Sequence, residues 1–310
     1  MSEISRIHLL HAAMIALLLL CWFVLPVYHA GNLARIMIFA IYAMGYNLLF
    51  GYTGLLSLGH ALFFGAGMYG LGLAMHLGGV SAGPGILAGL IAALVVSGVV
   101  GFLALRTSGV AFMIVTLMFA QAGYLTVLLF GTYTRGDEGF VLPQATRALF
   151  GIDLSDAQNR YFAALILFAI VLFFIGWLVR TPFGRCLVAI RENEERARML
   201  GYDIIRHKLI AVILSGTISG LSGAAYCLLF GSAQAAFVAV PYSIFPLLYV
   251  LLGGMGTTIG PFVGTLFMFY LIDWSGGNMM VAGFVLVALA LFAPAGILGE
   301  VRRRFITWLP

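Results

Sequence analysis

Residues 160–179 read RYFAALILFAIVLFFIGWLV, and residues 180–208 continue RTPFGRCLVAIRENEERARMLGYDIIRHK. The first stretch is apolar after its initial arginine and has the roughly 20 residues that an α-helix needs to cross a bilayer. The second contains seven of the sixteen basic residues of the chain. Placing seven such side chains within a membrane would cost roughly 17 to 25 kcal/mol. This boundary predicts a membrane-spanning helix followed by a charged loop in water.

Composition extends this prediction to the whole chain. Hydrophobic residues make up 63% of the 310 residues and charged residues 9%, whereas a soluble domain has about 25% charged residues. The first apolar stretch is expected to be an uncleaved helix rather than a signal peptide, because no clear cleavage site follows it. The chain is therefore expected to be an all-α, polytopic transmembrane helix bundle, a single domain over residues 1–310. The apolar stretches are 9–28, 33–50, 57–77, 84–105, 110–130, 160–179, 207–230, 242–272 and 278–293.

One of these stretches, 242–272, contains a glycine-rich interruption. Residues 253–261 read GGMGTTIGP, and so many helix-weakening residues are enough to break a helix. We interpret the segment as two short crossings joined by this break, which makes ten crossings in total. A re-entrant hairpin is the alternative, since irregular backbone at membrane depth is tolerated where protein buries it. The helix-breaking residues here are Gly253, Gly254, Gly256 and Gly260.

The basic residues determine the orientation, because short cytoplasmic loops carry an excess of Lys and Arg. With 180–208 in the cytoplasm, twelve basic residues lie inside and four outside. The long loop 131–159 is then extracytoplasmic. Arg302–Arg304 also belong inside, which requires an even number of crossings after Lys208. We expect a multi-pass protein of the cell inner membrane with both termini in the cytoplasm.

The charged stretch is expected to form a short amphipathic cytoplasmic helix over 185–201. Gly201 can end it. Two pairs have the favourable i,i+4 order, Glu192 with Arg196 and Glu194 with Arg198. The apolar stripe consists of Leu187, Ile190, Ala197 and Leu200. Such a helix can dock into a groove of a partner, and an ordinary solvated loop helix is the alternative.

Four motifs occur in order along the chain: NLLFGYTGLLSLGHALFFG at 47–65, the segment 181–201 with TPFGR, RENE and LG, LGGMG at 252–256 followed by GP, and FAPAGILG at 292–299. In order and spacing the chain resembles the LivM branch of the LivM/LivH permeases from about residue 32 to 300. These are membrane subunits of ABC importers for branched-chain amino acids. Two positions depart from the usual pattern: Leu55 stands where glutamine is common, and Ala295 where a basic residue is common.

The resemblance implies a transport subunit rather than an enzyme, in which 180–208 couples the permease to an ATPase. Its implied partners are ABC ATPase subunits, a second homologous LivH-like permease and an extracytoplasmic substrate-binding protein. ATP and Mg would be bound by the ATPase chains, and no cofactor by this one. Branched-chain amino acids are the usual substrate, whereas relatives handle urea, short amides and small organic or aromatic acids. The coupling residues would be Arg185, Arg191, Glu192, Glu194, Glu195, Arg198 and Gly201.

Polar residues around a second glycine-rich segment are candidates for the solute path. Gly51, Gly54 and Gly59 break the helix between two apolar stretches, and broken membrane helices expose backbone groups that can bind a zwitterion. Packing of these side chains against one another is the alternative. The path candidates are Asn47, Thr53, Ser57 and His60, with Thr116 and Gln121 in the fifth span.

The sequence lacks the motifs of several other functional classes. The single lysine, Lys208, rules out a GxxxxGK[ST] phosphate loop, so an ATP-driven process needs another chain. The scattered cysteines and histidines predict neither a disulfide framework nor a metal site, and the basic residues cluster in loops rather than form a nucleic-acid surface. A stand-alone secondary transporter or channel is the main alternative. It is disfavoured because Asp273, at the end of a span, is the one carboxylate near an apolar segment and more plausibly serves as a capping or interface group.

Overall fold

The computed structural model describes residues 3–276, 280, 283–285, 287 and 295–304, so most of the predicted span 278–293 lies outside the described residues. The described chain is mostly helical, which confirms the all-α prediction in its general form. Its α-helices are α1 Glu3–Val24, α2 Val27–Asn47, α3 His60–His76, α4 Ala82–Ala104, α5 Val110–Leu129, α6 Gly131–Thr134, α7 Ala157–Leu178, α8 Pro182–Glu192, α9 Glu194–Met199, α10 Ile204–Phe230, α11 Val240–Gly253, α12 Gly260–Trp274 and α14 Ile297–Arg304.

Shorter elements complete the chain. A π-helical turn, Leu48–Tyr52, continues α2, and 3-10 turns cover Gln144–Thr146 and Ala235–Val238. Two antiparallel ladders join two-residue strands: β1 Phe140–Val141 with β4 Ser232–Ala233, and β2 Ala148–Leu149 with β3 Ile152–Asp153. The β1–β4 ladder ties the predicted outer loop 131–159 to the segment that follows α10.

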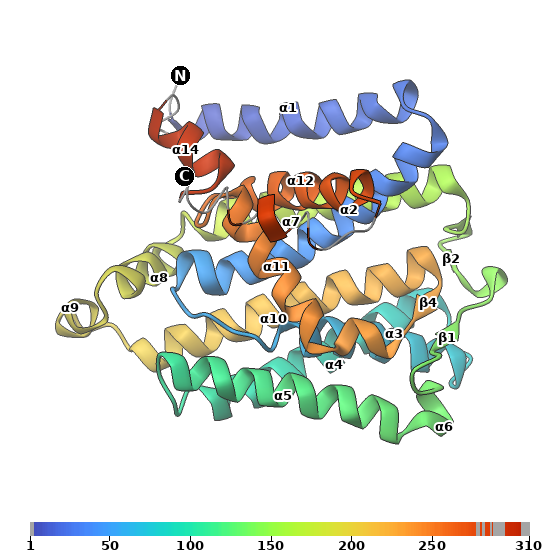
Figure 1. The fold of residues 1–310 in the computed structure, drawn as a ribbon, viewed down its shortest axis with the longest axis horizontal. Coiled ribbons are helices and arrows are strands. Elements are labelled where there is room, and N and C mark those ends of the chain that lie inside the picture. Colours follow the sequence, from blue (N-terminus) through green and yellow to red (C-terminus); the bar gives the residue numbers. More distant parts are fainter. Residues whose placement is uncertain (1–2, 277–279, 281–282, 286, 288–294, 305–310) are drawn as a thin grey trace.

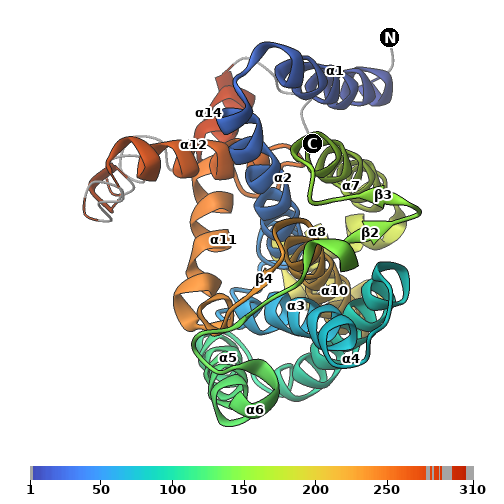
Figure 2. The same cartoon turned by 90° about the vertical axis from the view of Figure 1, so that its right-hand side faces the viewer.

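Five helices within the described residues are long and apolar enough to cross a membrane: Val27–Tyr52, Ala82–Ala104, Val110–Leu129, Ala157–Leu178 and Ile204–Phe230. They run along a common direction, with α8 and α9 at one end of the molecule and the strands at the other (Figure 1). The first residues of α1 and the helix α14 lie at the α8–α9 end. Figure 2 looks onto the strand end and shows α2, α3, α7 and α10 grouped together, with α5 at the edge.

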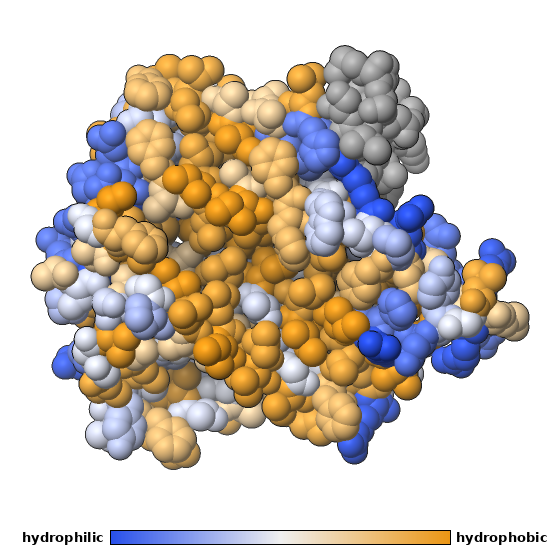
Figure 3. All heavy atoms as spheres, turned by 180° about the vertical axis from the view of Figure 1, so that it is seen from behind, coloured by the Kyte–Doolittle hydropathy of each residue, from blue (hydrophilic) through white to orange (hydrophobic). Residues whose placement is uncertain are grey.

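The core lies between α2, α3 and α10, and small residues bring these helices together. A Cβ built on Gly67 of α3 would overlap the carbonyl oxygen of Gly220 in α10, and one on Gly223 would overlap the carbonyl of Phe64. Such backbone-to-backbone contact is how membrane helices associate without a hydrophobic drive between them. In contrast, α4 and α5 expose broad apolar faces, and Figure 3 shows an apolar band between more polar ends.

The break predicted in 242–272 is present: α11 ends at Gly253 and α12 begins at Gly260. The two helices pack so closely that a Cβ on Gly264 of α12 would overlap the carbonyl oxygen of Tyr249 in α11. Each is too short to cross about 30 Å alone, since 15 residues rise about 22 Å. Asp273 lies in the last turn of α12, where its carboxylate accepts a 3.4 Å hydrogen bond from the Tyr28 hydroxyl.

Candidate coupling site

The charged segment folds as two helices rather than the single helix expected over 185–201. Thr181 and Pro182 start α8, with the Thr181 hydroxyl accepting from the Gly184 amide. At Asn193 the backbone becomes extended, and the Asn193 side chain accepts from the Arg196 amide at 2.9 Å to start α9. The prediction was wrong here because an asparagine side chain can cap a new helix as readily as it can continue an old one. Gly201 ends α9 as predicted, with φ of +88°.

The division into α8 and α9 alters the ion pairs and the apolar stripe that were predicted for this segment. Glu194 and Arg198 stand 3.6 Å apart, as expected for one turn of helix. Glu192 and Arg196 flank the break and form no ion pair among the described residues, so that prediction was wrong. Of the stripe, Leu200 is exposed, whereas Leu187, Ile190 and Ala197 are buried.

The α8–α9 pair is held to α10 by one apolar cluster and one ion pair. The cluster consists of Cys186, Ile190, Ala197 and Ile204. Lys208 Nζ donates to Glu194 Oε2 at 2.5 Å, which links α9 to α10. The outward side of the pair carries exposed apolar side chains, Met199 and Leu200, beside the exposed Arg185, Glu195 and Arg198. Figure 1 shows this pair projecting from one end of the bundle.

Arg191, near the end of α8, lies against both glycine-rich breaks. The first break is residues 51–59 and the second is residues 253–260. Its Nη1 donates to the carbonyl oxygen of Gly51 in the π-helical turn. A Cβ on Gly54 would stand 2.8 Å from Arg191 Cγ, and one on Gly256 would stand 3.1 Å from Nη1. Gly54 and Gly256 both have positive φ, +77° and +69°. Glycine is therefore required at these positions both for backbone conformation and for space.

Asn47 joins the two breaks directly. Its Nδ2 donates to the Thr257 carbonyl at 2.9 Å, and its Oδ1 accepts from the Gly256 amide at 3.0 Å. Both backbone groups belong to the irregular segment between α11 and α12, where no helix can satisfy them. His11 of α1 contacts the same segment, with Nε2 3.0 Å from the Thr258 hydroxyl. Sequence reasoning overlooked His11, whose only signal is a polar residue within an apolar stretch.

The first break is held from three other helices. The Leu58 amide donates to the Thr116 hydroxyl of α5 at 3.1 Å, and the Ala61 amide to the Ser243 hydroxyl of α11 at 2.9 Å. His60 Nε2 lies 2.8 Å from the Ser215 hydroxyl of α10. Ser215 and Ser243 were missed by sequence reasoning, because a serine in a membrane helix most often bonds its own backbone.

The hydrogen-bond network places a proton on Nε2 of His60. The Ser215 hydroxyl donates its one proton to the Gly45 carbonyl at 2.6 Å, so it accepts from His60 Nε2. His60 Nδ1 lies 3.2 Å from the Ser57 hydroxyl. The neutral Nε2–H form, with Nδ1 accepting from Ser57, is compatible with every contact.

Five of the six path candidates therefore surround the first break, and one does not. Asn47, Ser57, His60 and Thr116 are engaged as described, and Thr53 donates to the Leu48 carbonyl at 3.0 Å. All five are buried. Gln121 lies on the exposed side of α5 and makes no hydrogen bond to the other five in the described part of the chain.

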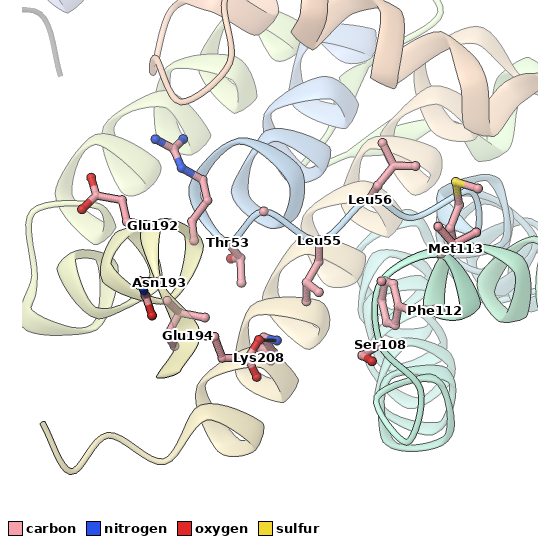
Figure 4. Close-up of a pocket in the computed structure, with 15 residues that line it drawn as sticks. Thr53, Leu55, Leu56, Ser108, Phe112, Met113, Glu192, Asn193, Glu194 and Lys208 are labelled. Carbon is pink, nitrogen blue, oxygen red and sulfur yellow. Dashed lines mark hydrogen bonds and ion pairs between the residues drawn. The ribbon is translucent and has the colours of Figure 1, made fainter. Parts of the chain in front are cut away.

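A cavity of about 470 Å³ opens between the break and the α8–α9 pair. In Figure 4, Thr53 and Leu55 of the break lie on one side, Glu192, Asn193 and Glu194 on another, and Phe112 and Met113 of α5 on a third. Lys208 lies beside Glu194 at its edge. The cavity lies beside the contact between α8 and the first break, and Gly54 and Arg191 both line it.

Comparison with known proteins places this geometry in context. Residues 29–294 match the family described as "Branched-chain amino acid transport system / permease component". The chain is 30% identical over 295 residues to the high-affinity branched-chain amino acid transport system permease protein LivM of Salmonella typhimurium, covering 86% of this chain and 69% of that protein. The LivM protein of Escherichia coli strain K12 matches to the same extent.

A more distant relative covers less of the chain. The L-arabinose transport system permease protein AraH of Escherichia coli strain K12 is 33% identical over 93 residues, 30% of this chain and 26% of that protein. No solved structure matches the chain.

Proposed function

Because the chain belongs to the family of branched-chain amino acid transport permease components, we propose that it forms one half of the path of an ABC importer, paired with a second, LivH-like permease. The family match and the apolar helices make it a multi-pass membrane transport subunit. A branched-chain amino acid is the proposed solute, because the LivM relatives are permeases for branched-chain amino acids. Urea, a short amide and a small organic or aromatic acid are the alternative solutes.

The observation that carries the proposal is the connection from the α8–α9 pair to both glycine-rich breaks. The pair presents exposed apolar and charged side chains to the outside of the bundle, as a docking surface for an ATPase subunit requires. On its inner side, Arg191 contacts Gly51 and lies against Gly256. A displacement of the pair by the ATPase would thus pull on the two places where the membrane helices are already interrupted.

We place α8, α9 and both termini in the cytoplasm of a cell inner membrane. Two observations support this orientation: the basic residues of 180–208 and the position of α1 and α14 at the α8–α9 end. The proposed ten crossings count α11 and α12 as two short crossings, although each rises only about 22 Å or less; counted as a re-entrant hairpin they would leave eight. The strand end would then face outward and receive a substrate-binding protein. ATP and Mg would be held by the ATPase chains.

The exposed side of α5 is our candidate for the path and for the contact with the second permease. Gln121 is a polar side chain on the exposed side of a helix that can span the membrane. Lipid would leave its amide without partners, which is costly. A facing permease chain, or a solute passing between the two chains, can supply them. Thr116 lies on the same helix, held to the first break.

Purification of the chain from native membranes in mild detergent with a non-hydrolysable nucleotide tests the proposal. Mass spectrometry of the complex is expected to identify an ABC ATPase and a second permease in comparable amounts. A matched preparation with Met199→Asp and Leu200→Asp should lose the ATPase and keep the second permease. Recovery of the chain alone, with solute uptake intact after reconstitution, would contradict the proposal and favour a stand-alone transporter.

A further inference from the structure

At the end opposite the coupling site, two arginines share one aromatic ring in a small pocket. Arg35 Cζ lies 5.2 Å from the centroid of the Phe230 ring, and Arg160 Cζ lies 5.5 Å from the same centroid. Both residues line a cavity of about 250 Å³ with Val27, Tyr28, Gly31 and Asn32. The pocket joins the first three turns of α2 and the first turn of α7 to the last residue of α10.

The two arginines of this pocket have no ion-pair partner within the described part of the chain. Neither Arg35 nor Arg160 forms an ion pair with a described carboxylate, and Arg160 Nε is buried without a hydrogen-bond partner. Asp156, one turn before Arg160, instead caps α7 by accepting from the Gln158 and Asn159 amides. Asp273 is engaged with the Tyr28 hydroxyl at the pocket's edge. Buried donors without partners usually mark a bound water, ion or ligand.

The surroundings of the pocket indicate what can reach it. The corner between α1 and α2 exposes the apolar side chains Phe23, Val24 and Val27, and Trp274 is exposed beside Asp273. Exposed apolar and aromatic side chains at the end of spanning helices are typical of the boundary between hydrocarbon and lipid headgroups. At that depth a phosphate is the commonest anion, and guanidinium groups bind phosphate with several directed donors.

We propose that the pocket formed by Arg35, Arg160 and Phe230 binds the phosphate of an anionic phospholipid headgroup in the outer leaflet. The two guanidinium groups would donate to the phosphate oxygens, Arg160 Nε among them. The acyl chains would lie over the apolar corner between α1 and α2. A bound lipid would thereby hold α2, which carries the first helix break at its far end, against α7 and α10.

The chain offers a matched control for this pocket. Arg106 Cζ lies 5.1 Å from the centroid of the Phe102 ring, so it repeats the contact of one arginine with one ring. It does so at the C-terminal end of α4, and no second arginine of the described residues lies over that ring. Arg35 is exposed, so its replacement should not prevent folding.

Native mass spectrometry of the full chain, with dioleoyl phosphatidylglycerol and dioleoyl phosphatidylcholine added in equal amounts, tests the proposal. The wild type and Arg106→Gln should retain the anionic lipid at least fivefold over the neutral one. Arg35→Gln and the double variant Arg35→Gln/Arg160→Gln should retain both lipids equally, while Arg35→Lys should keep part of the preference.

Three outcomes would overturn the proposal. The first is a double variant that keeps the wild-type preference for the anionic lipid. The second is removal of the bound phosphatidylglycerol by millimolar glycerol phosphate, a soluble anion, as effectively as by excess lipid. The third is a double variant that binds lipid normally but loses stimulation of ATP hydrolysis by the binding protein, which would assign the arginines to a protein partner. None of these outcomes bears on the coupling role of α8 and α9, which lie at the opposite end.

Discussion

The guanidinium of Arg191 in α8 donates a hydrogen bond to the carbonyl oxygen of Gly51, in the π-helical turn that ends α2. Gly51 begins the first helix break, and Asn47, one turn earlier, holds the second. A π-helical turn leaves carbonyl groups displaced from the regular α-helical pattern, so they are free to accept from outside the helix. One arginine thus connects the projecting α8–α9 pair to both glycine-rich breaks of the helix bundle.

Asn47→Leu should destabilise the chain strongly. It would leave the Gly256 amide and the Thr257 carbonyl buried without partners, at a cost of about 1 to 3 kcal/mol for each group. Thermal unfolding in detergent measures the effect. Asn159→Leu removes a single bond, to the Asp153 carbonyl at the strand end of the bundle, and should cost about 1 kcal/mol. Equal losses in the two variants would show that the contact between the breaks is not structurally important.

Gly67→Ala should prevent correct packing of α3 against α10, because the added methyl group overlaps the Gly220 carbonyl and backbone cannot move aside cheaply. The yield of monodisperse protein after size-exclusion chromatography is expected to fall severalfold. Gly98→Ala in α4 meets no atom within 4 Å and should be neutral or slightly stabilising, since alanine favours the helix by roughly 0.5 to 1 kcal/mol. Normal yield of Gly67→Ala would contradict the packing described for α3 and α10.

Which features could be predicted from the sequence depends on how far their physical cause extends along the chain. The apolar stretches and the break at 253–261 follow from local composition, so they are visible in the sequence. The division of 185–201 into α8 and α9 depends on Asn193 capping α9, which competes closely with a continuous helix. The contacts of Arg191 with Gly51 and of His60 with Ser215 join residues 140 and 155 positions apart. No local pattern specifies such pairs, and they appear only once the bundle has folded.

The ion pair between Glu194 and Lys208 should hold α9 against α10. Glu194→Gln or Lys208→Gln is expected to increase hydrogen exchange at the α9 amides severalfold, because the 2.5 Å contact is the one ion pair between these helices among the described residues. The exchanged pair Glu194→Lys/Lys208→Glu should restore part of the protection. Glu195→Gln, on the exposed side of α9, serves as the control and should leave exchange unchanged.

Cys186 should report displacement of the α8–α9 pair. Burial in the cluster with Ile190 raises the pKa of its thiol, so the reactive thiolate is scarce at neutral pH. Maleimide labelling of a Cys21→Ser/Cys227→Ser variant should be slow and should accelerate as the pH rises above 9. Ile190→Asp, which opens the cluster, should accelerate labelling at neutral pH about tenfold. Fast labelling without that change would mean that the pair is not docked on α10.

The most direct test of the coupling account compares Arg191→Ala with Arg196→Ala in proteoliposomes containing the complete importer. Both arginines belong to the α8–α9 segment, but Arg191 contacts the first break, whereas the Arg196 side chain forms no hydrogen bond or ion pair among the described residues. ATP hydrolysis and solute uptake are measured on the same vesicles. The account predicts that Arg191→Ala hydrolyses ATP at a rate near that of the wild type while uptake falls at least tenfold, and that Arg196→Ala retains both. Unchanged uptake per ATP in Arg191→Ala would contradict it.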